Sequence, residues 1–179
     1  MKLEAARRSA VTHELIYYGH ETLKKVAEEV MNIDGGLIKL IDAMYNVMYR
    51  AKGIGLAAPQ VDESRRIIIL DLEERDNLTM ELINPVIKSF SDTIEPYEEG
   101  CLSVPGLTGD IIRPVEILVS GINRDGKEVE FEADGLLSRV IQHEVDHLNG
   151  ILFIDRLEDY ARSELRPDLK QIKKLNRRL

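Results

Sequence analysis

The sequence predicts an α+β fold: antiparallel strands around a central helix, with further helices near the amino terminus and one at the carboxyl terminus. Apolar residues recur at helical spacing before residue 60 and after residue 134, and β-branched runs lie between these two segments. A hairpin signal joins two of the β-branched runs. The 179 residues are expected to form a single domain whose core needs no disulfide.

Two helices are expected before residue 60. The first covers residues 22–31, where apolar side chains recur at helical spacing. Gly35-Gly36 is expected to break the chain before the second helix, which covers residues 37–51. The inward-facing side chains of the second helix are expected to be Leu37, Ile41, Met44 and Met48. Residues 52–59 follow with many small side chains, which suits a tightly placed loop.

Strands are expected in the middle of the chain. Residues 66–70 and 81–83 are β-branched runs, and Asn84-Pro85 is expected to stop the second run. Residues 115–122 and 128–131 lie on either side of an Asn-Arg-Asp-Gly-Lys sequence that predicts a hairpin turn. Together these runs predict a largely antiparallel sheet.

A helix that begins at Asp134-Gly135 and ends at Asn149-Gly150 is expected to carry the chemistry. His143 and His147 lie four residues apart on it, so their ring nitrogens can point at one metal ion. Glu144 lies between them, where a carboxylate can move protons beside the metal. We therefore predict a metal site rather than two hydrogen-bonded core histidines.

The third metal ligand must come from elsewhere in the chain. No histidine follows His147, which argues against a metzincin-type protease, and Glu158 follows too closely for a thermolysin-like arrangement. The only cysteine, Cys101, lies in a glycine-containing segment where the backbone can approach closely. A lone cysteine is more often a small core residue, but beside the two histidines we favour the metal-ligand interpretation.

Charge and cysteine content narrow the functional classes. The net charge of −8 argues against a DNA-binding protein, and no apolar run approaches the ~20 residues of a membrane span. A single cysteine suits a reducing cytoplasm. Residues 1–14 have no apolar core, which excludes a standard secretory signal, and are expected to form a flexible leader.

Residues 160–179 form a predicted basic helical tail, with seven Lys or Arg against two acidic residues. The tail could dock on an anionic surface. Alternatively, it is a solvated helix that packs on the domain through Leu165, Leu169, Ile172 and Leu175.

Three segments resemble the three motifs of peptide deformylases, in the same order and with similar spacing. They are residues 53–60 (GIGLAAPQ), 99–103 (EGCLS) and 142–148 (QHEVDHL), and the resemblance extends from about Ile16 to Leu157. The continuation at residues 104–106 and the tail resemble the type common in Gram-negative bacteria. The chain departs from the family's usual residues at Gly19-His20, Asp62 and Ser138.

The resemblance implies removal of the N-formyl group from the formyl-methionine of newly synthesised polypeptides, with release of formate. By the same resemblance, Cys101, His143 and His147 hold a divalent metal and Glu144 moves the protons. The Gln60 side-chain amide and the Leu102 backbone N–H are the implied donors to the developing oxyanion. The implied substrate-binding residues are Ile54, Gly55, Leu136 and Val140.

The resemblance also implies the metal and the partners. Fe(II) is expected in cells, although a thiolate and two imidazoles also accept Zn, Ni or Co. The expected partners are N-formyl-methionyl nascent peptides and, through the basic tail, the ribosome; the oligomeric state is not predicted. Two functions are rivals to this interpretation. One is a zincin-like metallopeptidase, and the other is a non-catalytic module that has a structural metal and binds nascent chains or ribosomal RNA.

Overall fold

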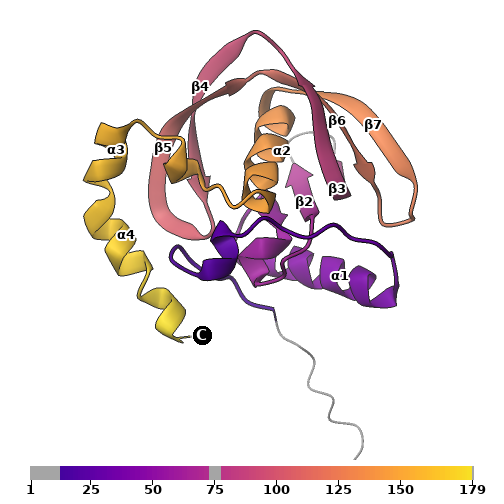
Figure 1. Ribbon diagram of the computed structural model, residues 1–179, viewed down its shortest axis with the longest axis horizontal. Coiled ribbons are helices and arrows are strands. Elements are labelled where there is room, and N and C mark those ends of the chain that lie inside the picture. Colours follow the sequence, from indigo (N-terminus) through magenta and orange to yellow (C-terminus); the bar gives the residue numbers. More distant parts are fainter. Residues whose placement is uncertain (1–12, 73–77, 179) are drawn as a thin grey trace, which may run out of the picture.

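The computed structural model describes residues 13–72 and 78–178. Most of the predicted leader, residues 1–12, lies outside the described residues. Figure 1 shows helices placed around curved antiparallel strands, in agreement with the predicted α+β class. None of the helices in residues 13–72 and 78–178 has the length and apolar composition of a membrane-spanning segment.

The largest sheet is antiparallel and five-stranded. Its strands, in spatial order, are β1 (Gly55–Ala57), β2 (Ile67–Leu72), β3 (Leu78–Phe90), β6 (Glu116–Ile122) and β7 (Glu128–Asp134). β6 and β7 form the hairpin that the sequence predicted, with the turn closed by the bond from Asn123 N–H to Lys127 O at 2.9 Å. A separate antiparallel hairpin consists of β4 (Ile94–Cys101) and β5 (Val104–Pro114).

Two helices cover opposite faces of the sheet around β2. Ile67 and Ile69 pack in one apolar cluster with helix α1 (Gly35–Arg50), whereas Ile68 and Leu70 pack in another with α2 (Gly135–Leu148). Because both faces are buried, β2 is a continuous apolar run rather than an alternating one. On its other side α2 meets the β4–β5 hairpin, so the predicted metal-binding helix lies inside the molecule (Figure 1).

The helix predicted for residues 37–51 is present, but the glycines before it do not break the chain. Asp34 caps α1, since its Oδ1 accepts a hydrogen bond from Leu37 N–H at 2.9 Å, and Gly35 and Gly36 form the first turn. The methionines Met44 and Met48 are fully buried, as expected of core residues.

The prediction of a helix at residues 22–31 is wrong. Only a short 3-10 helix, Glu21–Lys24, forms there, and Val26 is 68% exposed. The following residues are extended because their backbone groups bond to other segments: Ala27 N–H donates to Leu148 O, and Glu28 N–H donates to Ser64 O. These long-range bonds outweigh the local helical pattern.

The strand predicted to stop at Asn84-Pro85 continues as β3. The pairing with β6 shifts its register between Ile83 and Val86, and Asn84 has a φ of 51°. The Asn84 side chain bonds to both backbone groups of Val30, with its Oδ1 accepting at 2.9 Å and its Nδ2 donating at 2.9 Å. The two residues thus form an irregularity within a strand rather than its end.

The carboxyl-terminal tail is broken into shorter pieces, α3 (Asp159–Glu164), α4 (Arg166–Ile172) and a 3-10 turn (Leu175–Arg178). Pro167 lies in the first turn of α4, where its missing N–H interrupts a continuous helix. Leu169 and Ile172 are buried, so the tail packs on the body of the molecule. This agrees with the alternative in which the tail packs on the domain through its apolar side chains.

Candidate metal centre

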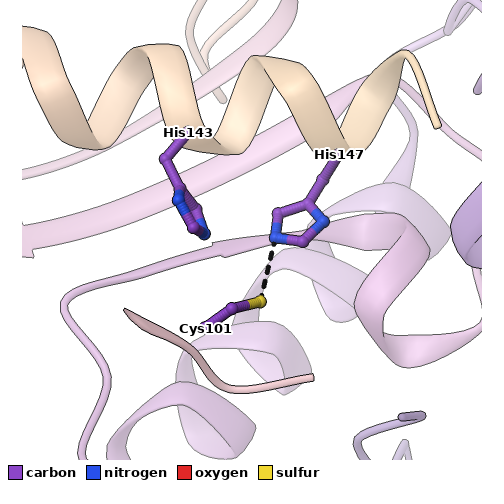
Figure 2. Close-up of side chains that lie close together, drawn as sticks. All are labelled: Cys101, His143 and His147. Carbon is purple, nitrogen blue, oxygen red and sulfur yellow. Dashed lines mark hydrogen bonds between the residues drawn. The ribbon is translucent and has the colours of Figure 1, made fainter. Parts of the chain in front are cut away.

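The predicted ligands come together from two elements. His143 and His147 project from one side of α2 toward Cys101, the last residue of β4, as Figure 2 shows. Cys101 Sγ lies 3.3 Å from His147 Nε2, and one ligand atom of each residue lies within 4.8 Å of the other two. The three side chains are therefore grouped around one point.

The group fits a divalent transition-metal ion. Bonds of ~2.0 to ~2.3 Å to nitrogen or sulfur keep the ligands of one ion within ~4.6 Å of each other, close to the observed spacing. His147 is 1% exposed and burial holds its pKa well below the ordinary value, so the ring is neutral and its Nε2 lone pair is available. The set of one thiolate and two imidazoles suits Zn or Fe chemistry.

Glu99 orients the other histidine. Its Oε2 lies 2.9 Å from His143 Nδ1, which leaves the opposite ring nitrogen to face Cys101. Arg113 holds Glu99 through two bonds, from Nε to Oε1 at 2.6 Å and from its NH2 group to Oε2 at 2.9 Å. Arg113 also donates to Asp146 Oδ2 at 2.8 Å, so a buried ion-pair network lies behind the histidine.

The same network sets the charge of Glu99. Burial alone would raise its pKa, but the hydrogen bonds from Arg113 and His143 lower the pKa to about 2. Glu99 is therefore ionised throughout the physiological range. In turn, hydrogen bonds with Cys101 and Glu99 outweigh the burial of His143 and raise the pKa of this ring well above its ordinary value.

Glu144 is buried beside the ligands with a free acceptor. Among the described residues, its Oε2 has no hydrogen-bond partner, and the side chain is only 4% exposed. Burial raises the pKa of Glu144 to about 7, which suits a group that both accepts and returns a proton. Gly55 makes room for this carboxylate, because a Cβ at that position would lie 2.6 Å from Glu144 Oε1.

Gln60 is oriented by its own loop. Its Oε1 accepts a hydrogen bond from Ala57 N–H at 2.8 Å, which directs the NH2 group toward Cys101 Sγ at 3.6 Å and Ser103 Oγ at 3.3 Å. The amide therefore braces the loop and also presents donors to the metal centre. Leu102, the residue after Cys101, packs so closely on Gly53 that a Cβ there would lie 2.6 Å from Leu102 Cδ1.

A cavity of about 830 Å³ opens beside these groups. Every predicted site residue except His147 lines it, and His147 lies buried behind the others. Ile54 is 46% exposed at this cavity, whereas Val140 is buried. The predicted residues that line the cavity are Ile54, Gly55, Gln60, Cys101, Leu102, Leu136, Val140, His143 and Glu144.

The sequence interpretation missed several residues at this site. Arg139 lies one helical turn before His143, bonds to Glu99 Oε1 at 2.9 Å, and lies with its guanidinium 5.2 Å from the centre of the Tyr97 ring. Its place in the helical stripe was a usable signal. No such signal exists for Arg113, because nothing in its local sequence distinguishes it from a surface arginine. Leu175, in the tail, also lines the cavity.

Ser138, one of the positions at which the sequence departs from the family that it resembles, bonds to the third motif. It is fully buried, and its Oγ accepts a hydrogen bond from Gln142 Nε2 at 2.9 Å. The same amide donates to Pro114 O at 2.9 Å. Ser138 therefore makes a buried contact within the helix that carries the histidines.

Comparisons with known proteins give one family. Residues 12–163 match the family described as polypeptide deformylase. Peptide deformylase 1 of Pseudomonas syringae pv. tomato is 42% identical over 162 residues, covering 90% of this chain and 96% of the relative. A crystal structure of a Synechococcus elongatus peptide deformylase in complex with actinonin is 44% identical, with a TM-score of 0.82, covering 89% of this chain and 86% of that one.

A second solved structure agrees. The Legionella pneumophila peptide deformylase has a TM-score of 0.85 and 38% identity, covering 93% of this chain and 98% of that one. Sequence, fold and the Cys-His-His group point the same way. The chain belongs to the polypeptide deformylase family, metal-dependent hydrolases that remove the N-formyl group from newly synthesised polypeptides.

Proposed function

We propose that Cys101, His143 and His147 hold the metal ion of this deformylase and that Glu144 moves the protons of the reaction. The observation that carries this proposal is that Glu144 lines the same cavity as Cys101 and His143 and has a buried oxygen with no hydrogen-bond partner among the described residues, while His147 completes the group of ligand atoms behind them. When bound, a divalent ion supplies Lewis-acid chemistry, lowering the pKa of water and polarising a carbonyl oxygen.

The chain's own residues would do the rest. Glu144 takes a proton from the attacking water and later delivers it to the departing amine, and its pKa of about 7 suits both transfers. The Gln60 side-chain amide and the Leu102 backbone N–H donate to the formyl oxygen as negative charge develops on it. One such donor typically contributes ~3 kcal/mol, or about two orders of magnitude in rate.

The methionine side chain would lie in the apolar part of the cavity. Ile54, Leu136 and Val140 line that part, and an unbranched thioether adapts well to such a pocket. Gly55 lets the substrate backbone approach, since its α-carbon carries no side chain between the strand and Glu144.

The metal in cells is proposed to be Fe(II), with Zn, Ni or Co as ions that the same ligands accept. The reducing cytoplasm, where a single free cysteine is stable as a thiolate ligand, is the proposed compartment. Anaerobic purification followed by metal analysis tests whether the metal is Fe(II). A predominance of zinc in protein made and kept without oxygen would contradict it.

Substitution of Glu144 tests the assigned chemistry. Glu144→Ala should keep the metal but lower formate release from a formyl-methionyl peptide by about 10²- to 10⁴-fold, because the proton carrier is lost. Glu158→Ala, at an exposed glutamate, is the matched control and should turn over normally. Normal turnover by Glu144→Ala would contradict the proposal. Cleavage of unformylated peptides at internal bonds would instead favour the metallopeptidase alternative.

We also propose that the basic tail contacts the ribosome. Lys170 and Lys174 are exposed on its outer side, whereas Leu169 and Ile172 are buried, so charge can be removed without disturbing the packing. Replacing both lysines by glutamine should weaken ribosome association and reduce the salt slope of log K by about 2. An unchanged affinity and slope would reject this contact.

A further inference from the structure

The end of the tail meets the amino-terminal segment beside the substrate cavity. Asn176 makes three hydrogen bonds to that segment: its Oδ1 accepts from Tyr17 N–H at 2.8 Å, and its Nδ2 donates to Tyr17 O at 2.9 Å and to Tyr18 O at 3.2 Å. One side chain thus satisfies three backbone groups of a segment that lies about 160 residues away in the sequence.

The opposite edge of the same segment is bonded to the catalytic loops. Ile16 N–H donates to Gln60 O at 2.9 Å, and Tyr18 N–H donates to Ser103 O at 2.8 Å. The N–H groups of Ile16 and Tyr18 thus bond to the loops, whereas the N–H group of Tyr17 between them bonds to Asn176. Residues 16–18, which we call the strap, therefore lie between the tail and the loops that carry Gln60 and Cys101.

The strap and the tail also form part of the cavity wall. Leu15 and Tyr17 from the amino-terminal side and Leu175 from the tail line the cavity that contains Cys101 and Glu144. Leu175 and Tyr17 pack against the apolar cluster that Cys101 also touches. This side of the cavity thus depends on residues beyond the three motifs.

Two features of the sequence bring the tail to this place. Pro167 interrupts the helix, and the buried side chains of Leu169 and Ile172 hold α4 on the body, so that the described tail reaches the amino-terminal elements (Figure 1). Gly19, at a φ of +95°, is packed by the tail: a Cβ there would lie 2.5 Å from Lys173 Cγ. The tail therefore also packs closely on Gly19, which directly follows the strap.

We propose that the tail completes the substrate site: Asn176 is a positioning residue that fixes Tyr17 in the cavity wall, and Leu175 contributes directly to that wall. This inference rests on the proposed function, since it concerns how the same cavity binds the formyl-methionyl peptide. In a variant without the Asn176 amide, the strap keeps its bonds to Gln60 O and Ser103 O, so the proton carrier and the oxyanion donors stay in place. Substrate binding weakens while the chemical step is retained, which is the signature of lost uniform binding.

The test compares three variants of the full-length, metal-loaded enzyme: Asn176→Ala, Leu175→Ala and the matched control Lys174→Ala. Lys174 is exposed, and within the described residues its side chain donates only to Gln171 Oε1, so its loss should change neither kcat nor KM for a free peptide. With a formyl-methionyl tripeptide, Asn176→Ala and Leu175→Ala should each raise KM about five- to tenfold, with kcat within about twofold of the control.

A second readout is independent of activity. Amide hydrogen exchange in the zinc-loaded protein should show the Tyr17 N–H exchanging at least about tenfold faster in Asn176→Ala than in Lys174→Ala, because its acceptor is gone. Leu175→Ala should leave this amide protected while still raising KM. If Asn176→Ala is too unstable to assay, Leu175→Ala alone decides whether the tail forms part of the site.

Three outcomes would overturn the inference. They are a KM equal to that of the control in both variants, a fall in kcat with KM unchanged, and unchanged protection of the Tyr17 amide in Asn176→Ala. A lower melting temperature with unchanged KM would show a purely structural contact and count against it as well. Wild-type enzyme that releases no formate would contradict the proposed function instead, and the exchange measurement would still report whether Asn176 holds the strap.

Discussion

At the scale of single residues, the site depends on how closely side chains approach Glu144 and His143. Gly55 and Glu99 show this most clearly. The first leaves space for a carboxylate, and the second fixes the orientation of an imidazole ring. Neither is a proposed metal ligand, yet each determines where a side chain with a proposed role in the reaction lies.

Gly55→Ala should lower kcat/KM about 10²-fold, because the new methyl group would lie 2.6 Å from Glu144 Oε1 and 2.8 Å from Val140 Cγ1 and must displace them. Steady-state formate release measures the effect. The matched control is Gly35→Ala, at a position where a Cβ meets nothing within 4 Å. Full activity of Gly55→Ala would show that the carboxylate does not need its observed position.

Glu99→Gln should weaken metal binding by about 10- to 100-fold, since the amide holds the His143 ring and supports its basicity less well than a carboxylate does. Competition with a chelator of known affinity measures the change. Glu98→Gln is the control, because Glu98 is the exposed neighbour on the same strand and bonds to Thr108 rather than to a ligand. Equal metal affinities of Glu99→Gln and Glu98→Gln would show that Glu99 does not support the metal site.

At the scale of elements, Asn84 joins β3 to the segment around Val30. It combines a left-handed backbone, with a φ of 51°, and two side-chain bonds at 2.9 Å. Asn84→Ala should lower the free energy of unfolding by about 3 kcal/mol, roughly 1 for each hydrogen bond and 1 for the backbone conformation. Urea unfolding measures this loss.

Asn84→Gly separates the two contributions. Glycine tolerates the positive φ, so this variant should lose about 2 kcal/mol, mainly from the two hydrogen bonds. If both variants are as stable as the wild type, the irregularity in β3 has no role in holding the segment of Val30 in place.

The same scale explains which elements could be predicted from sequence. α1 and α2 were predictable because their apolar residues follow helical spacing over more than three turns. The β4–β5 hairpin was not expected, since β4 is rich in glutamate, mostly exposed, and stabilised by pairing with its partner rather than by its own composition. The helix prediction was wrong at residues 25–28 for a similar reason, because the backbone there is held by hydrogen bonds to Leu148 and Ser64.

At the scale of the whole molecule, the candidate metal centre is where segments distant in sequence converge. The spacing of His143 and His147 on one helix, together with a lone cysteine, predicted that these three side chains would group together, as they do, and their role as metal ligands stays a prediction. The ion-pair network behind His143 could not be predicted, because Arg113 meets Glu99 and Asp146 only through the tertiary fold. The contact of Asn176 with Tyr17 likewise exists only after the tail has folded back.

The central claim is that Cys101 is the third ligand of a catalytic metal. Its most direct test measures metal content and formate release on the same anaerobically purified samples of wild-type protein and Cys101→Ser. We predict about one divalent metal ion per wild-type chain with formate released from a formyl-methionyl peptide, and loss of both properties in the variant. Retention of the metal and of full turnover in Cys101→Ser would contradict the claim.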